Sequence, residues 1–257
     1  MMIVDVHAHL DFEEYEKDLD AVMEANRKAG VKAIVNHGTT AKANRRVLEL
    51  AKKYGLIKPA LGIYPVYAAE MKEEDFDKEI EFIKKQDNIV AIGEVGLDYY
   101  IGDDNPHGDK YRTEMKKCFE KFIKLAEHRK LPLVAHSRRA ELDVIEMLES
   151  SSINKNKIVM HCFMGRKHLV KRVLDNGWSL SIPCIIGRLQ QLQENVSMAH
   201  ISQLLTETDA PYMSPYPDIK RNEPRFIIET IKKIAEIKKL DEEETAKLLY
   251  MNYQRLF

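Results

Sequence analysis

The sequence predicts an α/β fold: a (β/α)8, or TIM, barrel formed by one domain that spans residues 1–257. Short apolar runs alternate with longer amphipathic stretches along the whole chain, which is typical of parallel strands joined by right-handed helical crossovers. There are eight such runs in a chain of 257 residues. Eight strand–helix units in this length favour a closed barrel over an open doubly wound sheet.

The eight candidate strands are short, and several are rich in β-branched residues, as expected of parallel strands buried on both faces. In chain order they are Ile3-Val4, Ala33–Val35, Ala60–Ile63, Ile89–Ile92, Leu131–Val134, Ile158–Met160, Trp178–Ile182 and Leu204-Leu205.

Amphipathic helices are predicted between these strands and after the last one. The clearest cover residues 14–29, 110–129, 139–149, 223–237 and 241–255. Asn26 interrupts the apolar stripe of the first helix. Gly30 and Gly55 follow helical stretches where a C-terminal cap is expected. Asn222 and Pro224 indicate the start of the helix at 223–237.

Composition and charge restrict the classes of function. Net charge is −1, from 40 basic and 41 acidic residues, so a sequence-independent basic coat for DNA is excluded and any nucleic-acid contact must be local. No stretch approaches the ~18 apolar residues of a membrane span, and the N-terminal segment is too short and polar for a signal peptide. Cys118, Cys162 and Cys184 are odd in number and lack CxxC spacing, which predicts reduced thiols in a cytoplasmic protein. No coiled-coil pattern is present, so a monomer is expected.

Polar residues with catalytic chemistry follow the predicted strands, at the barrel end where active sites form. Asp5, His7, His9 and Asp11 follow the first strand, Glu94 the fourth, His136 the fifth, His161 the sixth and Asp209 the eighth. A single histidine at a strand end is most often only hydrogen-bonded. The joint occurrence at five strand ends favours a metal centre instead.

The predicted metal ligands are His7, His9, Glu94, His136, His161 and Asp209. His7 and His9 are two apart on a strand-like segment, so both point to the same side and form a clamp. Glu94 can bridge two ions through its two oxygens. Asp209 can bind one ion and accept a proton from bound water. Among the other histidines, His37 ends the second strand and could face the mouth of the site, although an ordinary polar role is favoured. His107, His128, His168 and His200 are assigned no chemistry.

These motifs resemble those of the TatD family of metal-dependent deoxyribonucleases. The resemblance rests on the segments Asp5–Leu10, Gly93–Tyr99, His136–Arg138, His161–Phe163, Glu207–Tyr212, Lys220–Pro224 and Asn252–Phe257. It implies the six metal ligands above, with Glu94 replacing the carbamylated lysine of related barrels. It also implies metal-dependent cleavage of DNA, often from the 3′ end.

The chain departs from the family after the third strand. The family often has Gly-x-His-Pro-His there, whereas this chain has Tyr64 and Val66 in place of the two histidines. Tyrosine can hydrogen-bond a phosphate or stack on a base, but it does not readily replace imidazole as a proton donor. Tyr99 and Tyr100 are further stacking candidates, with barrel-rim packing the alternative for each.

The predicted chemistry is hydrolysis of a phosphodiester, with DNA as the substrate and 3′–5′ exonuclease polarity. Two divalent ions (Zn, Mn or Mg) activate water, with Asp209 and Glu94 as the catalytic carboxylates. Arg138, Lys220, Arg221 and Tyr64 are candidate phosphate contacts, with solvated surface charge the alternative for the three cations. Two alternatives remain open: hydrolysis of a carbon-centred ester such as aminoacyl-tRNA or a lactone, and a non-catalytic metal-binding scaffold. The basic residues suit phosphate better than a neutral carbonyl, and a proton acceptor beside bound water argues against a scaffold.

Overall fold

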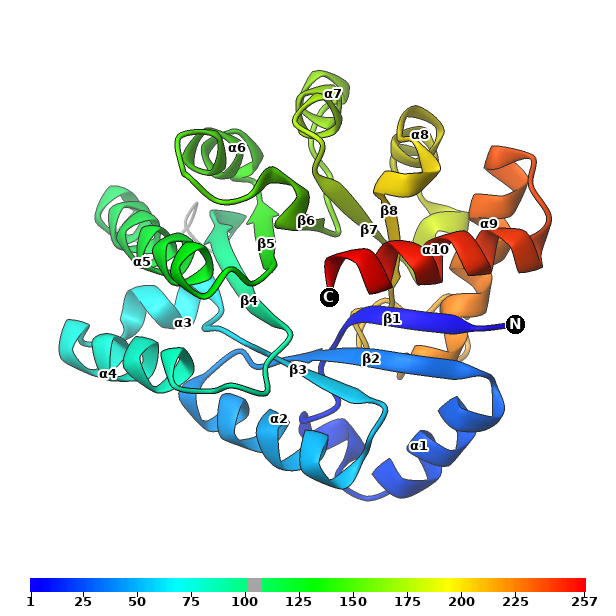
Figure 1. Ribbon diagram of the computed structural model, residues 1–257, viewed down its shortest axis with the longest axis horizontal. Coiled ribbons are helices and arrows are strands. Elements are labelled where there is room, and N and C mark those ends of the chain that lie inside the picture. The colour runs from blue at the N-terminus through cyan, green and yellow to red at the C-terminus, as the bar shows by residue number, and fades with distance from the viewer. Residues whose placement is uncertain (101–107) are drawn as a thin grey trace.

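The computed structural model describes residues 1–100 and 108–257, and it forms one barrel of eight parallel strands (Figure 1). The strands are β1 Ile3–Ala8, β2 Val31–His37, β3 Ile57–Leu61, β4 Ala91–Asp98, β5 Leu133–Arg138, β6 Ile158–His161, β7 Ser179–Pro183 and β8 Leu204–Glu207. Each strand pairs in parallel with the next along the chain. The amide of His9 donates to the carbonyl of Ala210 at 2.7 Å, and Ala8 bridges Ala210, which brings the end of β8 against β1. The predicted fold class is confirmed.

Several strands extend further towards their carboxyl ends than their apolar runs predict. His7 lies within β1, Glu94 within β4 and His136 within β5, whereas the sequence placed them at or just past the strand ends. The ladder continues through these polar residues, with Gly96 paired to His136 between β4 and β5. Hydropathy alone does not detect this extension, because the polar side chains of these residues are buried at the site.

Helices surround the barrel on its outside (Figure 1). They are α1 Leu19–Lys28, α2 Ala41–Lys53, α3 Pro65–Glu70, α4 Glu73–Lys84, α5 Gly108–Arg129, α6 Glu141–Glu149, α7 Lys167–Asp175, α8 Gln190–Met198, α9 Ile227–Lys238 and α10 Glu242–Leu256. The helix predicted at 14–29 is split into a 3-10 turn at Glu13–Tyr15 and α1, where Asn26 is buried. Gly30, two residues after the end of α1, has a left-handed φ of 89°. Gly55 is not left-handed, and the residue that caps α2 is Tyr54, in extended backbone.

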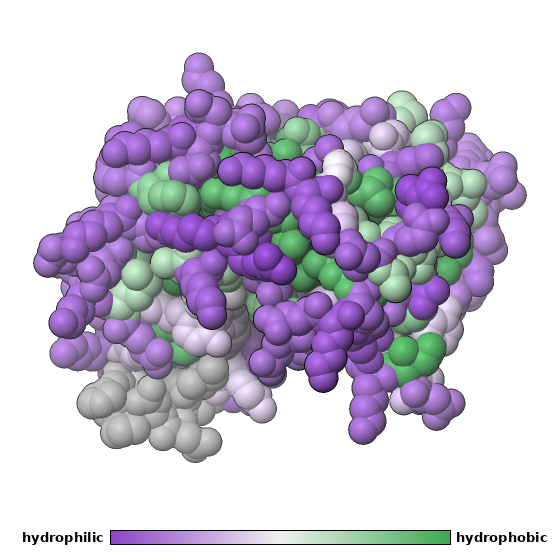
Figure 2. Space-filling view, turned by 90° about the horizontal axis from the view of Figure 1, so that it is seen from below, coloured by the Kyte–Doolittle hydropathy of each residue, from purple (hydrophilic) through white to green (hydrophobic). Residues whose placement is uncertain are grey.

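The outer surface of this layer is polar, as amphipathic helices require. Figure 2 shows the side on which α1 and α2 lie in Figure 1, and hydrophilic residues cover most of it, with hydrophobic ones visible between them. Within the described ranges 1–100 and 108–257, no helix is both long enough and apolar enough to cross a membrane.

The barrel interior has a hydrophobic cluster of its own, separate from the larger core beneath the helices. It contains Val4, Val6, Ala33, Val35, Ala60, Ala91, Val134, Val159, Leu205 and Leu256. All of these except Leu256 come from strands. Leu256 is contributed by α10, which packs beside β1 and closes this cluster (Figure 1).

We expect Leu256→Ala to destabilise the protein by about 2–5 kcal/mol, because it leaves a cavity among packed barrel residues. Leu256 is only 4% exposed. The matched control is Met251→Ala on the same helix, which is 52% exposed and should change stability by about 0.5 kcal/mol or less. Guanidinium unfolding monitored by circular dichroism measures both. Equal effects of the two substitutions would contradict the packing assigned to α10.

Candidate metal centre

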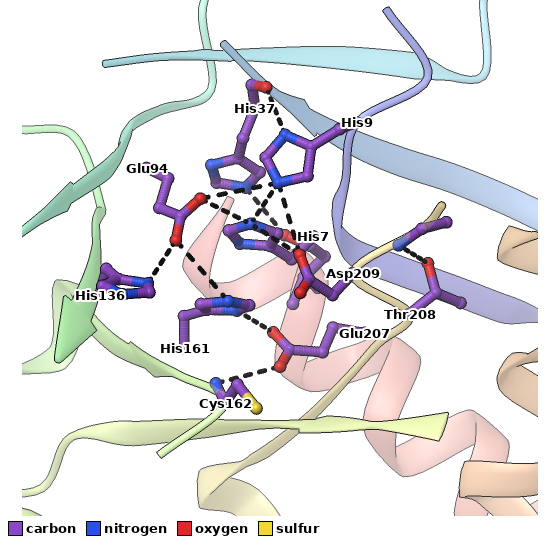
Figure 3. A network of polar contacts seen from close by, with 12 residues as sticks. His7, His9, His37, Glu94, His136, His161, Cys162, Glu207, Thr208 and Asp209 are labelled. Atoms are coloured by element: carbon purple, nitrogen blue, oxygen red, sulfur yellow. Dashed lines mark hydrogen bonds and ion pairs between the residues drawn. The ribbon is translucent and has the colours of Figure 1, made fainter. Parts of the chain in front are cut away.

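Five strands bring the predicted ligands together at one end of the barrel (Figure 3). The Nε2 atoms of His7 and His9 lie 3.2 Å apart. Oε2 of Glu94 lies 3.4 Å and 3.6 Å from these two nitrogens. Its other oxygen, Oε1, lies 2.6 Å from Nδ1 of His136 and 3.8 Å from Nε2 of His161. The two oxygens of one carboxylate therefore face two different pairs of histidines.

Asp209 completes the cluster from the turn after β8. Its Oδ1 lies 3.7 Å from Nε2 of His7 and 3.4 Å from Nε2 of His9. Its backbone is left-handed, with φ of 55°, and its amide donates to the carbonyl of His7 at 2.9 Å. The Asp209 side chain is 17% exposed, whereas Glu94 is 5% exposed, so Asp209 is the carboxylate of this pair that solvent reaches more readily.

The donor set fits divalent metal ions. Three groups of ligand atoms lie within 4.8 Å of one another: His7, His161 and Asp209; His7, His9 and Glu94; and Glu94, His136 and His161. Imidazole nitrogens combined with carboxylate oxygens suit Zn and Mn, and Mg prefers oxygen. Buried carboxylates that converge in this way are costly unless a positive charge balances them. These residues can therefore hold metal ions.

Protons supply that positive charge when no ion is bound. Burial opposes protonation of His9, but hydrogen bonding and attraction to Asp209 raise its pKa to about 9. Burial also opposes protonation of His136 and His161. Glu94 and Asp98 nevertheless raise the pKa of His136 to about 10, and Glu207 raises the pKa of His161 to about 9. His7 behaves differently, because burial and the neighbouring histidines hold its pKa well below its usual value.

We expect metal binding to release protons, about one from each of the three histidines whose pKa is raised. A raised pKa keeps the imidazole protonated at neutral pH, and the proton must leave before the nitrogen can bind metal. Affinity should therefore fall as pH decreases from 9 to 6. Metal titration of the stripped protein in a weak buffer with an indicator dye measures the release. A pH-independent affinity without proton release would contradict these protonation states.

Two carboxylates that the sequence analysis did not single out orient the histidine ligands. Glu207 is buried and accepts from Nδ1 of His161 at 2.8 Å and from the amide of Cys162 at 3.0 Å (Figure 3). Asp98 is buried, lies 3.2 Å from Nε2 of His136 and accepts from the hydroxyl of Tyr64. Such partners fix the tautomer and orientation of a ligating imidazole. Both carboxylates lie in segments on which the family resemblance rests: Glu207 in Glu207–Tyr212 and Asp98 in Gly93–Tyr99. These segments are the sequence signal by which the two carboxylates could have been found.

His37, for which an ordinary polar role is expected, lies against the cluster, and its Nε2 is 3.0 Å from the carbonyl oxygen of Val6. Its ring stacks on His7 with centroids 4.0 Å apart, and His7 stacks in turn on His161 at 3.7 Å. The carbonyl of His37 accepts from Nδ1 of His9 at 2.9 Å, which leaves Nε2 of His9 facing the cluster. Burial lowers the pKa of His37 to about 3, so the ring is neutral.

Asp5 and Asp11 do not belong to the cluster of ligand atoms; they accept hydrogen bonds from residues in and around it. Asp5 accepts from the amide of His7 at 3.1 Å and from the hydroxyl of Thr208 at 2.5 Å, which ties β1 to the end of β8. Asp11 accepts from Nδ2 of Asn36 at 2.7 Å.

Close packing behind Glu94 requires glycine at position 93. A Cβ on Gly93 would lie 2.9 Å from Cβ of Val134 and 3.1 Å from Nδ1 of His37. A side chain here would therefore push against two strands that carry the site, which explains the glycine that precedes the candidate bridging carboxylate.

We expect Glu207→Gln to weaken metal binding about 10- to 100-fold, the range typical of outer partners of metal ligands. The amide of glutamine donates where the carboxylate accepts, so the proton of His161 would be favoured on Nε2, the atom that faces Glu94. Competition with a chelator measures the change. Glu24→Gln, on the exposed surface of α1, is the control. Unchanged affinity in Glu207→Gln would show that the contact does not set the tautomer.

The candidate phosphate contacts are placed differently from one another. Arg138 is exposed at the end of β5, two residues after His136, and its guanidinium lies 3.7 Å from the ring of Tyr100. Lys220 is exposed on the loop after β8. Arg221 is paired with both oxygens of Asp18 at 2.7 Å, so a phosphate would have to compete with that carboxylate.

Tyr64 and other aromatic and histidine residues named from the sequence contact groups of the protein itself. The Tyr64 ring packs against His136, with centroids 5.1 Å apart, and Val66 is buried. The hydroxyl of Tyr99 donates to Asp143 at 2.6 Å. His200 caps a 3-10 turn, and His107 lies outside the described residues.

Comparison with known proteins identifies the group to which this barrel and cluster belong. A family model described as TatD related DNase matches residues 4–257. The chain belongs to the TatD family. It is 34% identical to the uncharacterised metal-dependent hydrolase YabD of Bacillus subtilis, over 100% of this chain and 99% of that protein. It is 30% identical to deoxyribonuclease TATDN3 of Homo sapiens, over 99% of this chain and 94% of that protein.

A solved structure of the TatD family has the same fold. The crystal structure of YJJV, a TatD homologue from Escherichia coli K12, superimposes with a TM-score of 0.89 at 26% identity. The match covers 99% of this chain and 97% of that one. The sequence-based resemblance is confirmed, and the protein is a metal-dependent hydrolase of the TatD family.

Proposed function

We propose that this TatD-family protein is a phosphodiesterase that degrades DNA as a 3′–5′ exonuclease, using two divalent ions bridged by Glu94. The observation that carries the two-ion proposal is the placement of the Glu94 oxygens, one beside His7 and His9 and the other beside His136 and His161. Asp209, beside His7 and His9, would complete the first set. Bound divalent ions supply Lewis acidity and lower the pKa of water.

Asp209 is the proton acceptor in this proposal. It is the partly exposed carboxylate of the cluster, and the buried Glu94 is committed to both pairs of histidines. The left-handed turn at Asp209 and its amide contact with His7 hold the backbone of Asp209, and its Oδ1 lies beside Nε2 of His7 and His9, the atoms that would bind the first ion. General-base assistance of this kind contributes about 10²- to 10⁴-fold to a rate.

Arg138 and Lys220 would hold the phosphate. Arg138 shares the strand face of His136, because strand side chains alternate, and its charge reaches Tyr64 beside the cluster. A phosphate that contacts Arg138 would lie close to the proposed ions. Tyr64 donates to Asp98, so in this proposal it supports His136 through that carboxylate and contacts phosphate only when that bond is exchanged.

DNA is the proposed substrate because a relative that matches nearly the whole chain is named a deoxyribonuclease. The near-zero net charge agrees with contacts limited to the site, since a general basic surface is lacking. The proposal includes a reducing compartment, which the three free cysteines support. It also includes a monomeric state. Light scattering after size exclusion tests the monomer.

The test incubates metal-stripped protein, reloaded with Mg, Mn or Zn, with single-stranded DNA labelled at the 3′ or the 5′ end. We expect mononucleotides to appear only with metal, with the label released first from the 3′ end. Hydrolysis of small carbon esters or aminoacyl-tRNA, with the DNA left intact, would overturn the phosphodiesterase proposal. Full thermal stability of the stripped protein without any hydrolysis would favour a scaffold.

A further inference from the structure

Two rows of aromatic rings lead from the candidate ligands to exposed tyrosines. On one side, the ring of Phe12 stacks on His9 with centroids 4.9 Å apart, and Tyr212 meets Phe12 edge to face at 6.1 Å. Tyr212 is 53% exposed. Aromatic residues that are this exposed, although they lie one ring away from a buried cluster, offer free faces for stacking.

The second row begins at the other side of the cluster. Tyr64 packs on His136 at 5.1 Å, and Tyr67 packs on Tyr64 with centroids 5.8 Å apart. Tyr67 is 47% exposed. The two rows thus begin at histidines that face opposite oxygens of Glu94.

The two terminal tyrosines are reached from one cluster, because His9 and His136, where the two rows begin, both face Glu94. Each exposed tyrosine is therefore separated from a predicted ligand by a single intervening ring, Phe12 for Tyr212 and Tyr64 for Tyr67.

Both tyrosines are carried by well-anchored backbone. The amide of Tyr212 donates to the carbonyl of Asp209 at 2.9 Å, and the buried side chain of Asn222 donates to the carbonyls of Thr208 and Met213 on either side of this turn. Tyr67 lies on α3, where the hydroxyl of Tyr111 on α5 donates to the carbonyl of Val66 at 3.0 Å. Anchored rings lose little conformational entropy when a ligand binds.

We propose that Tyr67 and Tyr212 form a stacking site for an unpaired nucleobase, the base of the terminal nucleotide whose phosphate enters the metal centre. The site deepens the proposed function and rests on it. Base–aromatic stacking tolerates every base, because each has a π face. Arg138, exposed beside the same cluster, would complement the phosphate of that nucleotide. The site therefore selects single-stranded or frayed ends over paired ones.

The test uses the full-length, metal-loaded protein and two single-stranded oligonucleotides, one with a normal 3′ nucleotide and one with an abasic 3′ nucleotide. We expect Tyr212→Ala and Tyr67→Ala to raise KM for the normal substrate by about 5- to 100-fold, the range that loss of a stacked base produces. KM for the abasic substrate and kcat should change little. Tyr212→Phe and Tyr67→Phe keep the ring and should behave as wild type. Met251→Ala, exposed on α10, is the surface control.

A fluorescence measurement separates failure of this inference from failure of the proposed function. Terminal 2-aminopurine is quenched on stacking, and Asp209→Asn protein binds the strand without turnover. The measurement compares Asp209→Asn protein with variants that carry Tyr67→Ala or Tyr212→Ala in addition. Loss of the quenching in these variants supports the stacking site even if the wild type hydrolyses no DNA. Equal KM changes for normal and abasic substrates, or quenching that survives both alanine changes, would overturn it.

Discussion

Replacing Asp209 with asparagine should lower kcat for phosphodiester hydrolysis by about 10²- to 10⁴-fold, the contribution of a positioned general base. The amide keeps the shape of the side chain and one oxygen beside His7 and His9, but it cannot accept a proton at neutral pH. The fold should not change, because the Asp209 backbone is held by its contacts with His7 and Tyr212. Hydrolysis of labelled single-stranded DNA, with metal content measured on the same samples, gives the result.

The control for this substitution is Asp218→Asn, an exposed carboxylate on the same loop. It should leave kcat unchanged. If Asp209→Asn retains more than about a tenth of wild-type kcat with its metal content intact, another group accepts the proton. The role assigned to Asp209 would then be incorrect.

The second large effect is expected for Glu94→Gln. In the wild type, one carboxylate oxygen of Glu94 faces His7 and His9, and the other faces His136 and His161. In the glutamine variant an NH2 group, which can only donate, replaces one of these two oxygens. The negative charge of the proposed bridge is also lost from a buried site, so at least one of the two proposed ions should be lost on dialysis, and hydrolysis should fall to background. Elemental analysis of the dialysed protein measures the ions directly.

Glu146→Gln, exposed on α6, is the matched control for charge removal. Its metal content should equal that of the wild type. Full metal content in Glu94→Gln would contradict a bridging role for Glu94, since neither set of histidines would then depend on it.

The fold and the convergence of the cluster could be predicted because they depend on regular patterns. Alternating apolar runs identify the strands, and the barrel then brings polar residues from β1, β4, β5, β6 and β8 to one end. His7 and Asp209 are far apart in the chain, but this rule alone places them together. The strand ends were less predictable, because a hydrogen-bonded ladder that continues through Glu94 and His136 is not visible in hydropathy.

The partners of the site residues could not be predicted in the same way. Arg221 pairs with Asp18, 203 positions away, and Tyr64 bonds Asp98, 34 positions away. No periodic pattern links such residues, so the sequence could not show that these side chains already have carboxylate partners. The contact of His9 with the carbonyl of His37 is still harder to foresee, because any residue at position 37 supplies a carbonyl.

The most direct test of the central claim is anomalous diffraction from crystals of the protein loaded with Mn or Zn. The account predicts two peaks that share Glu94, one beside His7, His9 and Asp209 and the other beside His136 and His161. A single peak, or peaks away from Glu94, would contradict the two-ion centre on which the proposed phosphodiester hydrolysis depends.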